Sequence, residues 1–244
     1  MLYWLGFAGL TAVFVASVCL STIAYKKQQR IRYTNNQIRQ IRRKIDELSE
    51  IKSTLLKTDD EYDILLFLQQ KILAYLSRIH ALKPNATEIN EEINKEAYHL
   101  DNYKNGIRKN EIQKAVENDS EIKSTNIRLS ALIRLLLATE KMGSISKGKC
   151  ADLIYHTQKL KLDIEVESHL KQSESYLAND DRVTAQTHLK QAKKALRSSP
   201  VEYPEKTQQI KEISARIKAI TSQILVNANV NSMPVSGPGI GQSD

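Results

Sequence analysis

Hydrophobic residues recur every three or four positions along most of the chain, which is the period of an amphipathic α-helix. An uninterrupted apolar run occupies residues 2–24, and later segments repeat the three-four spacing as far as Ile224. The residues that strands prefer never alternate with period two for long, so no sheet is expected. The pattern predicts an all-α fold: an N-terminal transmembrane helix that continues into a coiled-coil-like helix, followed by a body of helical bundle and helical hairpins.

Helix starts and breaks divide the chain into six predicted parts. Thr58, Asp59 and Asp60 are N-cap residues before a Leu- and Ile-rich helix that Pro84 stops. The final residues are polar and contain Pro and Gly, which is typical of a segment that cannot bury enough surface to fold. The predicted parts are a transmembrane anchor at 1–25, a basic juxtamembrane, coiled-coil-like helix at 26–58, a helical bundle at 59–141, a loop at 142–149, a helical hairpin region at 150–226 and a disordered tail at 227–244.

The apolar run at residues 2–24 carries no charged side chain. At about 1.5 Å per residue it reaches roughly 34 Å, enough to cross a hydrocarbon layer of about 30 Å. Tyr3 and Trp4 lie at one end and Tyr25 at the other, where aromatic rings meet lipid headgroups. A cleaved signal peptide is the competing interpretation, but the start of the chain lacks basic residues and the run exceeds the usual apolar length of a signal.

The positive charge of the chain is concentrated directly after this run. The net charge is +8, residues 25–44 contain eight basic residues and no acid, and the other 28 basic residues equal the 28 acidic ones. Because basic residues favour the cytoplasmic side, we expect a single-pass membrane protein with its N-terminus outside and its body cytoplasmic. Lys26, Lys27, Arg30 and Arg32 are the predicted contacts to lipid headgroups.

Two patterns raise the question of self-association. Ala8, Ala12 and Ala16 recur every four residues and would let two membrane helices approach closely, although Ala is also common on lipid-facing surfaces. Isoleucines at 31, 38 and 45, interleaved with Ile41, Leu48 and Leu55, form a heptad seam of about three heptads. The seam is compatible with a homodimer and equally with packing of this helix onto the body of the same chain.

The segment GSISKGKC at 143–150 approaches the phosphate-binding pattern G-x-x-x-x-G-K-[ST]. That chemistry needs a hydroxyl after the lysine to hold Mg²⁺ and a strand before the first glycine. Cys150 replaces the hydroxyl, and a Leu-rich helical pattern precedes Gly143. We therefore predict a loop between two helices and no nucleotide site.

No other motif supports a catalytic, cofactor or metal site. Glu96 and His99 form one Glu-x-x-His element of the kind that di-iron helical bundles use twice, but no second copy exists in the sequence. The chain contains no Gly-x-Ser-x-Gly elbow, paired-cysteine zinc motif or dinucleotide fingerprint. Its two cysteines, Cys19 and Cys150, exclude a disulfide framework. We expect no enzyme, no cofactor and no metal.

Residues 167–200 resemble one tetratricopeptide-type helical hairpin. Tyr176, Ala185, Leu189 and Ala192 stand where that repeat places its packing residues, and residues 179–181 would form the turn. Asp180 stands where the repeat has glycine, and Pro200 comes three residues late. A single hairpin cannot build a solenoid, so packing and a peptide-binding groove are both open interpretations.

The layout of nearly the whole chain resembles an uncharacterised family of gammaproteobacterial single-span inner-membrane helical proteins, some of which carry an automatic DNA-repair label. The shared features are the uncharged span, the basic helix after it, the Leu-rich segment IRLSALIRLLLATEKMGSISKG and the terminal hairpin ESHLKQSESYLANDDRVTAQTHLKQAKKAL. The resemblance implies that the chain lies in the bacterial inner (plasma) membrane and has a single-span, helical architecture. It implies no activity.

These observations favour a membrane-tethered cytoplasmic interaction or scaffold protein without catalytic activity. Its expected partners are membrane lipid and another protein, whose identity the sequence does not indicate. The alternative is a nucleic-acid-associated membrane protein that uses the basic juxtamembrane segment. We consider this alternative weaker, because the residues that would bind phosphate lie next to the headgroups of the membrane.

Overall fold

The structure is a computed structural model that describes residues 2–59, 62–106, 115, 116 and 118–231, with the side chains of residues 2–16, 18, 19 and 226–231 left undescribed. The described residues form seven α-helices and no strand, which confirms the all-α prediction. The helices are α1 (Leu2–Thr58), α2 (Tyr62–Leu82), α3 (Thr87–Lys104), α4 (Asp119–Lys141), α5 (Lys147–Ala178), α6 (Arg182–Ser198) and α7 (Lys206–Asn231).

The chain divides into two compact units, and α1 contributes to both. Unit 1 comprises Met1–Lys52 and Tyr62–Arg108, and unit 2 comprises Ser53–Glu61 and Lys109–Asp244. The last turn of α1 therefore belongs to unit 2, where the carboxylate of Asp59, fully buried, lies 2.9 Å from Nε2 of His156 on α5. A residue that the sequence indicates as a helix cap is thus held in the interior of unit 2.

Unit 1 is organised around α2, whose apolar residues face several sides. Ile64, Leu65, Leu68, Ile72 and Leu76 are all essentially inaccessible to solvent. α3 packs beside α2 and buries Ile89 and Tyr103, and the final part of α1 adds buried residues of its own. The density of apolar residues in α2 predicts this central position, because a helix that is hydrophobic all round must be covered all round.

The heptad seam of α1 is exposed at its start and buried further along the helix. Ile41, Ile45, Leu48 and Ile51 are buried within unit 1, whereas Ile31 is half exposed. Arg42 binds both carboxylate oxygens of Glu92, which ties this part of α1 to α3. From Ile41 onward the seam therefore packs inside the chain, and this part of the seam is closed to a second copy.

Among the described residues, no helix is both long enough and apolar enough to cross a membrane. The predicted span covers residues 2–24. Most of its side chains, those of residues 2–16, 18 and 19, lie outside the described residues. The backbone there continues without a break into the rest of α1, which is one helix of 57 residues.

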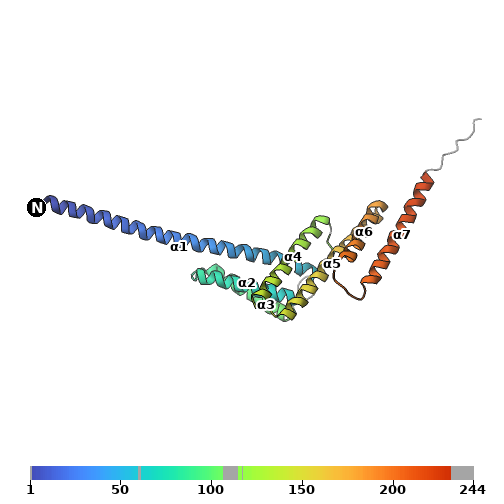
Figure 1. The fold of residues 1–244 in the computed structure, drawn as a ribbon, viewed down its shortest axis with the longest axis horizontal. Helices are drawn as coiled ribbons and strands as arrows, with labels where there is room; N and C mark the ends of the chain where they lie inside the picture. The colour runs from blue at the N-terminus through green and yellow to red at the C-terminus, as the bar shows by residue number, and fades with distance from the viewer. Residues whose placement is uncertain (1, 60–61, 107–114, 117, 232–244) are drawn as a thin grey trace, which may run out of the picture. The chain divides into compact units, whose positions relative to one another are not determined.

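Unit 2 stacks its helices in chain order, with α4 against α5, α5 against α6 and α6 against α7 (Figure 1). One apolar cluster holds the last three together. It consists of Leu162 and Val166 from α5, Leu189, Ala192, Ala195 and Leu196 from α6, Val201 from the following loop, and Ile213 and Ile220 from α7. The isoleucine stripe that the sequence shows in the last helix is thus the face that α7 lays on the hairpin.

The two hairpin turns of unit 2 use the same backbone motif. After α4, Gly143 has a φ of 70°, its N–H donates to the carbonyl of Glu140 (2.8 Å), and Ser144 N–H donates to Thr139 (3.1 Å). After α5, Asp180 has a φ of 59°, and the N–H groups of Asp180 and Asp181 donate to Leu177 (3.0 Å) and Tyr176 (2.9 Å). This is the Schellman ending, in which a left-handed residue closes the helix.

Two predicted boundaries are corrected by the helix ends. The predicted loop at 142–149 is shorter, because Ser146 accepts a hydrogen bond from the N–H of Lys149 and starts α5 at Lys147. The predicted tail at 227–244 begins too early, because α7 continues to Asn231. No Gly or Pro occurs between Lys206 and Pro234, so neither residue type stops the helix at residue 227. Residues 232–244 lie outside the described residues.

We predict that Asp180→Gly stabilises the protein. A side chain at a left-handed position costs roughly 1 kcal/mol that glycine avoids, and the exposed ion pair of Asp180 with Arg182 contributes little in return. The melting temperature followed by circular dichroism should rise by roughly 2 to 4 °C. Asp180→Ala is the control, since it removes the charge but keeps the Cβ; an equal rise in both variants would assign the effect to the charge instead.

Candidate functional site

The predicted lipid contacts lie on the exposed half of α1. Lys26, Lys27, Arg30 and Arg32 are all solvent-exposed, as are the apolar residues on either side of them. Leu20 is 68% exposed and Tyr33 is 66% exposed. The structure therefore leaves this basic segment available. Lys26, Lys27 and Arg30 fall within about 100° around the helix axis, and Arg32 lies on another side.

The hairpin residues lie between α5 and α6, in the interior of unit 2. Ala185 and Ala192 have no exposed surface, and Leu189 is nearly as buried. Small residues at such positions let two helix backbones approach closely, as the sequence pattern predicts. Tyr176 is different: it is 38% exposed, and its ring stacks on that of His188 with centroids 5.3 Å apart.

The far side of α6 is covered by α7. Leu189 and Ala192 share one apolar cluster with Ile213 and Ile220 of α7, and Gln186 donates a hydrogen bond to Thr221 (2.6 Å). Gln186 is thus engaged within the chain. α7 therefore covers part of the α5–α6 hairpin.

The segment at 143–150 joins α4 to α5, as predicted, and its last four residues already belong to α5. α4 precedes it, Gly143 ends that helix, and Ser146 caps the next one. Cys150, which takes the place of the magnesium-binding hydroxyl, is buried. Burial and the neighbouring Glu140 raise the pKa of its thiol, which disfavours the thiolate form that reacts or binds metal.

Glu96, from the Glu-x-x-His element, takes part in an ion-pair network within unit 1. Its carboxylate accepts from Nζ of Lys52 on α1 (2.8 Å) and from Nε2 of Gln69 on α2 (2.6 Å). Burial opposes ionisation of this carboxyl, but the bonds from Lys52 and Gln69 outweigh it and lower the pKa of Glu96. Ionised Glu96 therefore stabilises unit 1 at neutral pH, and this contribution is lost as the pH falls through its folded pKa.

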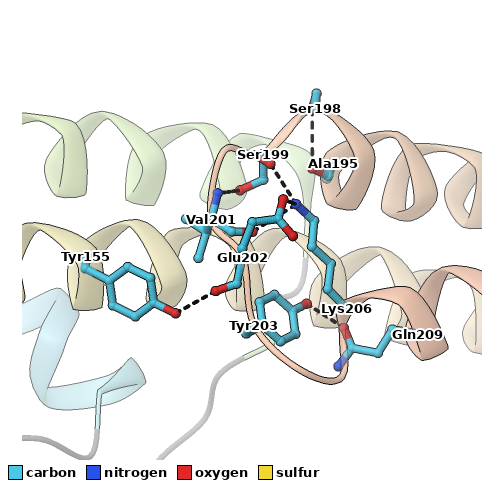
Figure 2. A network of polar contacts seen from close by, with 9 residues as sticks. All are labelled: Tyr155, Ala195, Ser198, Ser199, Val201, Glu202, Tyr203, Lys206 and Gln209. Carbon is cyan, nitrogen blue, oxygen red and sulfur yellow. Dashed lines mark hydrogen bonds and ion pairs between the residues drawn. The ribbon is translucent and has the colours of Figure 1, made fainter.

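A buried lysine organises the loop between α6 and α7 (Figure 2). Nζ of Lys206 donates to the carbonyls of Ser199 and Val201 and to the carboxylate of Glu202, each at 2.8 Å. Tyr155 of α5 donates its hydroxyl to the carbonyl of Glu202 (2.9 Å), which fastens the loop to the hairpin. The three bonds use the three donors of the ammonium group, as a buried charge requires.

One cluster of metal-ligating side chains forms among the described residues, and it lies in unit 2. Asp119 begins α4, His169 lies in α5 and His188 lies in α6. One ligand atom from each lies within 4.8 Å of the other two, and the Nδ1 atoms of the two histidines are 3.3 Å apart. Both histidines are buried, whereas Asp119 is exposed.

Neighbouring contacts hold the three residues in place. Asn118 accepts from the N–H of Glu121 and caps α4, which fixes Asp119 as the first residue of that helix. The N–H of Val116 donates to the hydroxyl of Ser168 (2.9 Å), next to His169, so the segment before α4 is attached to α5. Tyr176 stacks on His188 and sets the plane of its ring.

The surroundings of the cluster favour the neutral form of His188. Burial is the main cause that lowers the pKa of His188, the neighbouring His169 lowers it further, and Asp119 opposes both. Protonation of His188 would place a charge in a desolvated site beside another imidazole.

Sequence patterns do not indicate this cluster, because its members come from three helices. The Glu-x-x-His pattern occurs only at Glu96 and His99, and Glu96 instead forms the ion-pair network of unit 1. A partial signal was present: His169 lies 10 residues before the turn at 179–181 and His188 lies 7 residues after it. An antiparallel hairpin therefore brings them within about one helical turn of each other along its axis.

Comparison of the chain with models of protein families, with curated proteins and with solved structures finds no match. The resemblance to the inner-membrane family therefore stays a prediction. What can be assigned at this point is a class of architecture, an all-α protein built of helical hairpins, and its function has to be inferred from the residues of this chain.

We predict that Lys206→Met destabilises unit 2 by about 3 kcal/mol, because it leaves buried carbonyl oxygens without their donor. The free energy of unfolding in urea measures the effect. Lys211→Met is the matched control, since Lys211 is exposed on the same helix and its loss should change stability by less than about 0.5 kcal/mol. Equal stability of the two variants would mean that the loop does not depend on the ammonium group.

Proposed function

We propose that the protein is a membrane-tethered, non-catalytic interaction protein whose helical body is held at the cytoplasmic face of a bacterial inner membrane and binds another protein there. In this proposal residues 1–25 anchor the chain, the N-terminus lies outside, and the basic residues after the span contact lipid headgroups.

The observation that carries the proposal is the exposed part of α1. Large apolar side chains at Leu20, Ile23 and Tyr25 are exposed on a helix whose first buried residue in the described part is Ile41. Exposed apolar residues in such a row need a cover, and the uncharged run at 2–24 has the length that a bilayer requires. A lipid bilayer supplies that cover for the run as a whole.

The charge pattern supports the same placement. Lys26, Lys27, Arg30 and Arg32 follow the apolar run within about two turns and are exposed, so each can gain roughly 1 kcal/mol from anionic headgroups. A role in nucleic-acid binding would need the same four side chains. The two roles compete, and proximity to the span favours the lipid.

The protein partner is expected at the tip of the α5–α6 hairpin. Tyr176, Leu177 and Val183 are exposed there, all within four residues of Asp180. Their clustering around one turn supports a contact surface, because apolar side chains that are exposed together on a protein often mark an interaction site. α7 leaves this end of the hairpin accessible at these three side chains.

We predict that a phosphatase fused after Asp244 stays on the cytoplasmic side and shows no activity beyond background. We also predict that alkaline carbonate does not extract the protein from membranes. Changing Lys26, Lys27, Arg30 and Arg32 to Gln should let part of the population invert and raise phosphatase activity, since the charge bias sets orientation. Changing Lys190, Lys193, Lys194 and Arg197 on α6 to Gln removes equal charge far along the sequence and should leave activity at background. An active wild-type fusion, or release by carbonate, would refute the proposed anchoring.

The nucleic-acid alternative has its own test. It would be favoured if the wild type retained duplex DNA and the variant with Lys26, Lys27, Arg30 and Arg32 changed to Gln did not.

We also predict that a protein crosslinked to the full-length chain in membranes is lost in the double variant Leu177→Ser, Val183→Ser. Both side chains are exposed, so the melting temperature should stay within about 2 °C of the wild type. Ile127→Ser changes an exposed residue of α4 and serves as the control. Recovery of the same protein by all three chains would place the contact elsewhere on the body.

A further inference from the structure

We infer that Asp119, His169 and His188 form a binding site for a divalent first-row transition-metal ion, of which Zn²⁺ is the simplest representative. The inference goes beyond the proposed function and does not depend on it, because all three residues lie in unit 2 and none lies in the anchor.

The separation of the two histidine nitrogens has the value that such an ion requires. A tetrahedral ion with metal–nitrogen bonds of about 2.0–2.1 Å holds two ligand atoms roughly 3.3–3.4 Å apart. The Nδ1 atoms of His169 and His188 are 3.3 Å apart, and their rings are tilted by 36° rather than stacked. An ion placed between them would reach both nitrogens without movement of either helix.

A hydrogen bond between the two imidazoles is the simpler interpretation of the same pair. It requires one Nδ1 to carry a proton and the other to accept it across 3.3 Å. A metal ion instead uses the lone pairs of both nitrogens together. The distance suits either arrangement, and the carboxylate of Asp119 beside the pair favours the ion.

Asp119 supplies the third ligand. Its carboxylate lies within 4.8 Å of both histidines and is exposed, so rotation of the side chain can bring an oxygen into bonding distance. Two imidazole nitrogens with one carboxylate oxygen suit zinc and its neighbours, whereas Mg²⁺ and Ca²⁺ prefer oxygen ligands alone.

Two of the three ligands border an open hollow of about 530 Å³. Its lining residues are Asn118, Asp119, Lys171, Gln172, Ser175, Tyr176 and His188. Water or a side chain of another molecule that enters this hollow could complete the coordination. The ion would also join the start of α4 to α5 and α6, three elements that the chain otherwise connects through apolar packing and a few hydrogen bonds.

The test uses the full-length protein in detergent, without an affinity tag and stripped of metal by a chelator. Co²⁺ should produce the visible absorption of a tetrahedral ion with nitrogen and oxygen ligands, Zn²⁺ should remove that absorption by displacement, and Mg²⁺ should do neither. Zn²⁺ should also raise the melting temperature, since it binds the folded state.

His169→Gln and His188→Gln should each lower Co²⁺ affinity by at least about 10-fold, because loss of a ligand costs no less than loss of a residue that supports one. His99→Gln is the control for an imidazole outside the site. Asp119→Asn should weaken binding while the metal-free melting temperature stays unchanged, since this side chain is exposed; Asp152→Asn, exposed on α5, is its control. The Asp119 comparison keeps the test valid if a histidine variant fails to fold.

The inference is overturned by absence of Co²⁺ absorption, or by equal affinity in the wild type and in both Asp119→Asn and a folded histidine variant. The first result would leave a hydrogen-bonded histidine pair only, and the second would assign binding to other residues.

Discussion

The close approach of α5 and α6 is the constraint on which most of unit 2 depends. Ala185 and Ala192 have no exposed surface, and a larger side chain at either position would separate the two helices. The same approach brings His169 within 3.3 Å of His188 and presents the apolar face on which α7 packs. The packing residues of the hairpin and the histidine cluster are therefore two consequences of one geometry, rather than independent features.

Partly buried Glu96 and buried Lys206 are each held by partners from other helices or loops. Glu96 is fixed by Lys52 and Gln69, so α1, α2 and α3 meet at one polar point within unit 1. Lys206 holds the α6–α7 loop through two carbonyls and a carboxylate (Figure 2). Because each buried charge requires several correctly placed partners, these networks favour one arrangement of the helices over alternatives with similar apolar contacts.

α1 combines two environments in one continuous helix. Its seam is buried from Ile41 onward, whereas the side chains around Lys26 to Arg32 remain exposed. Because α1 is one continuous helix, the length between its basic residues and Ile41 sets how far the buried part of unit 1 lies from those residues. In the proposed membrane setting, this would hold unit 1 at a set distance from the headgroups. The buried part of the seam also limits a homodimer contact through this seam to residues before Ile41.

The sequence by itself determined the all-α class, the order of the helices and most of their ends, because helical periodicity, caps and Pro or Gly breaks are local signals. It also indicated that Ala185, Leu189 and Ala192 are packing residues, since small and large residues at fixed spacing reflect one helix face. Tertiary structure alone decided that Glu96 binds Lys52, that α7 covers the hairpin and that Asp119 meets His169 and His188. The polar contacts among them join residues of separate helices that are 19 to 69 positions apart in the sequence. Nothing in local sequence encodes such distances, which arise only when the helices pack.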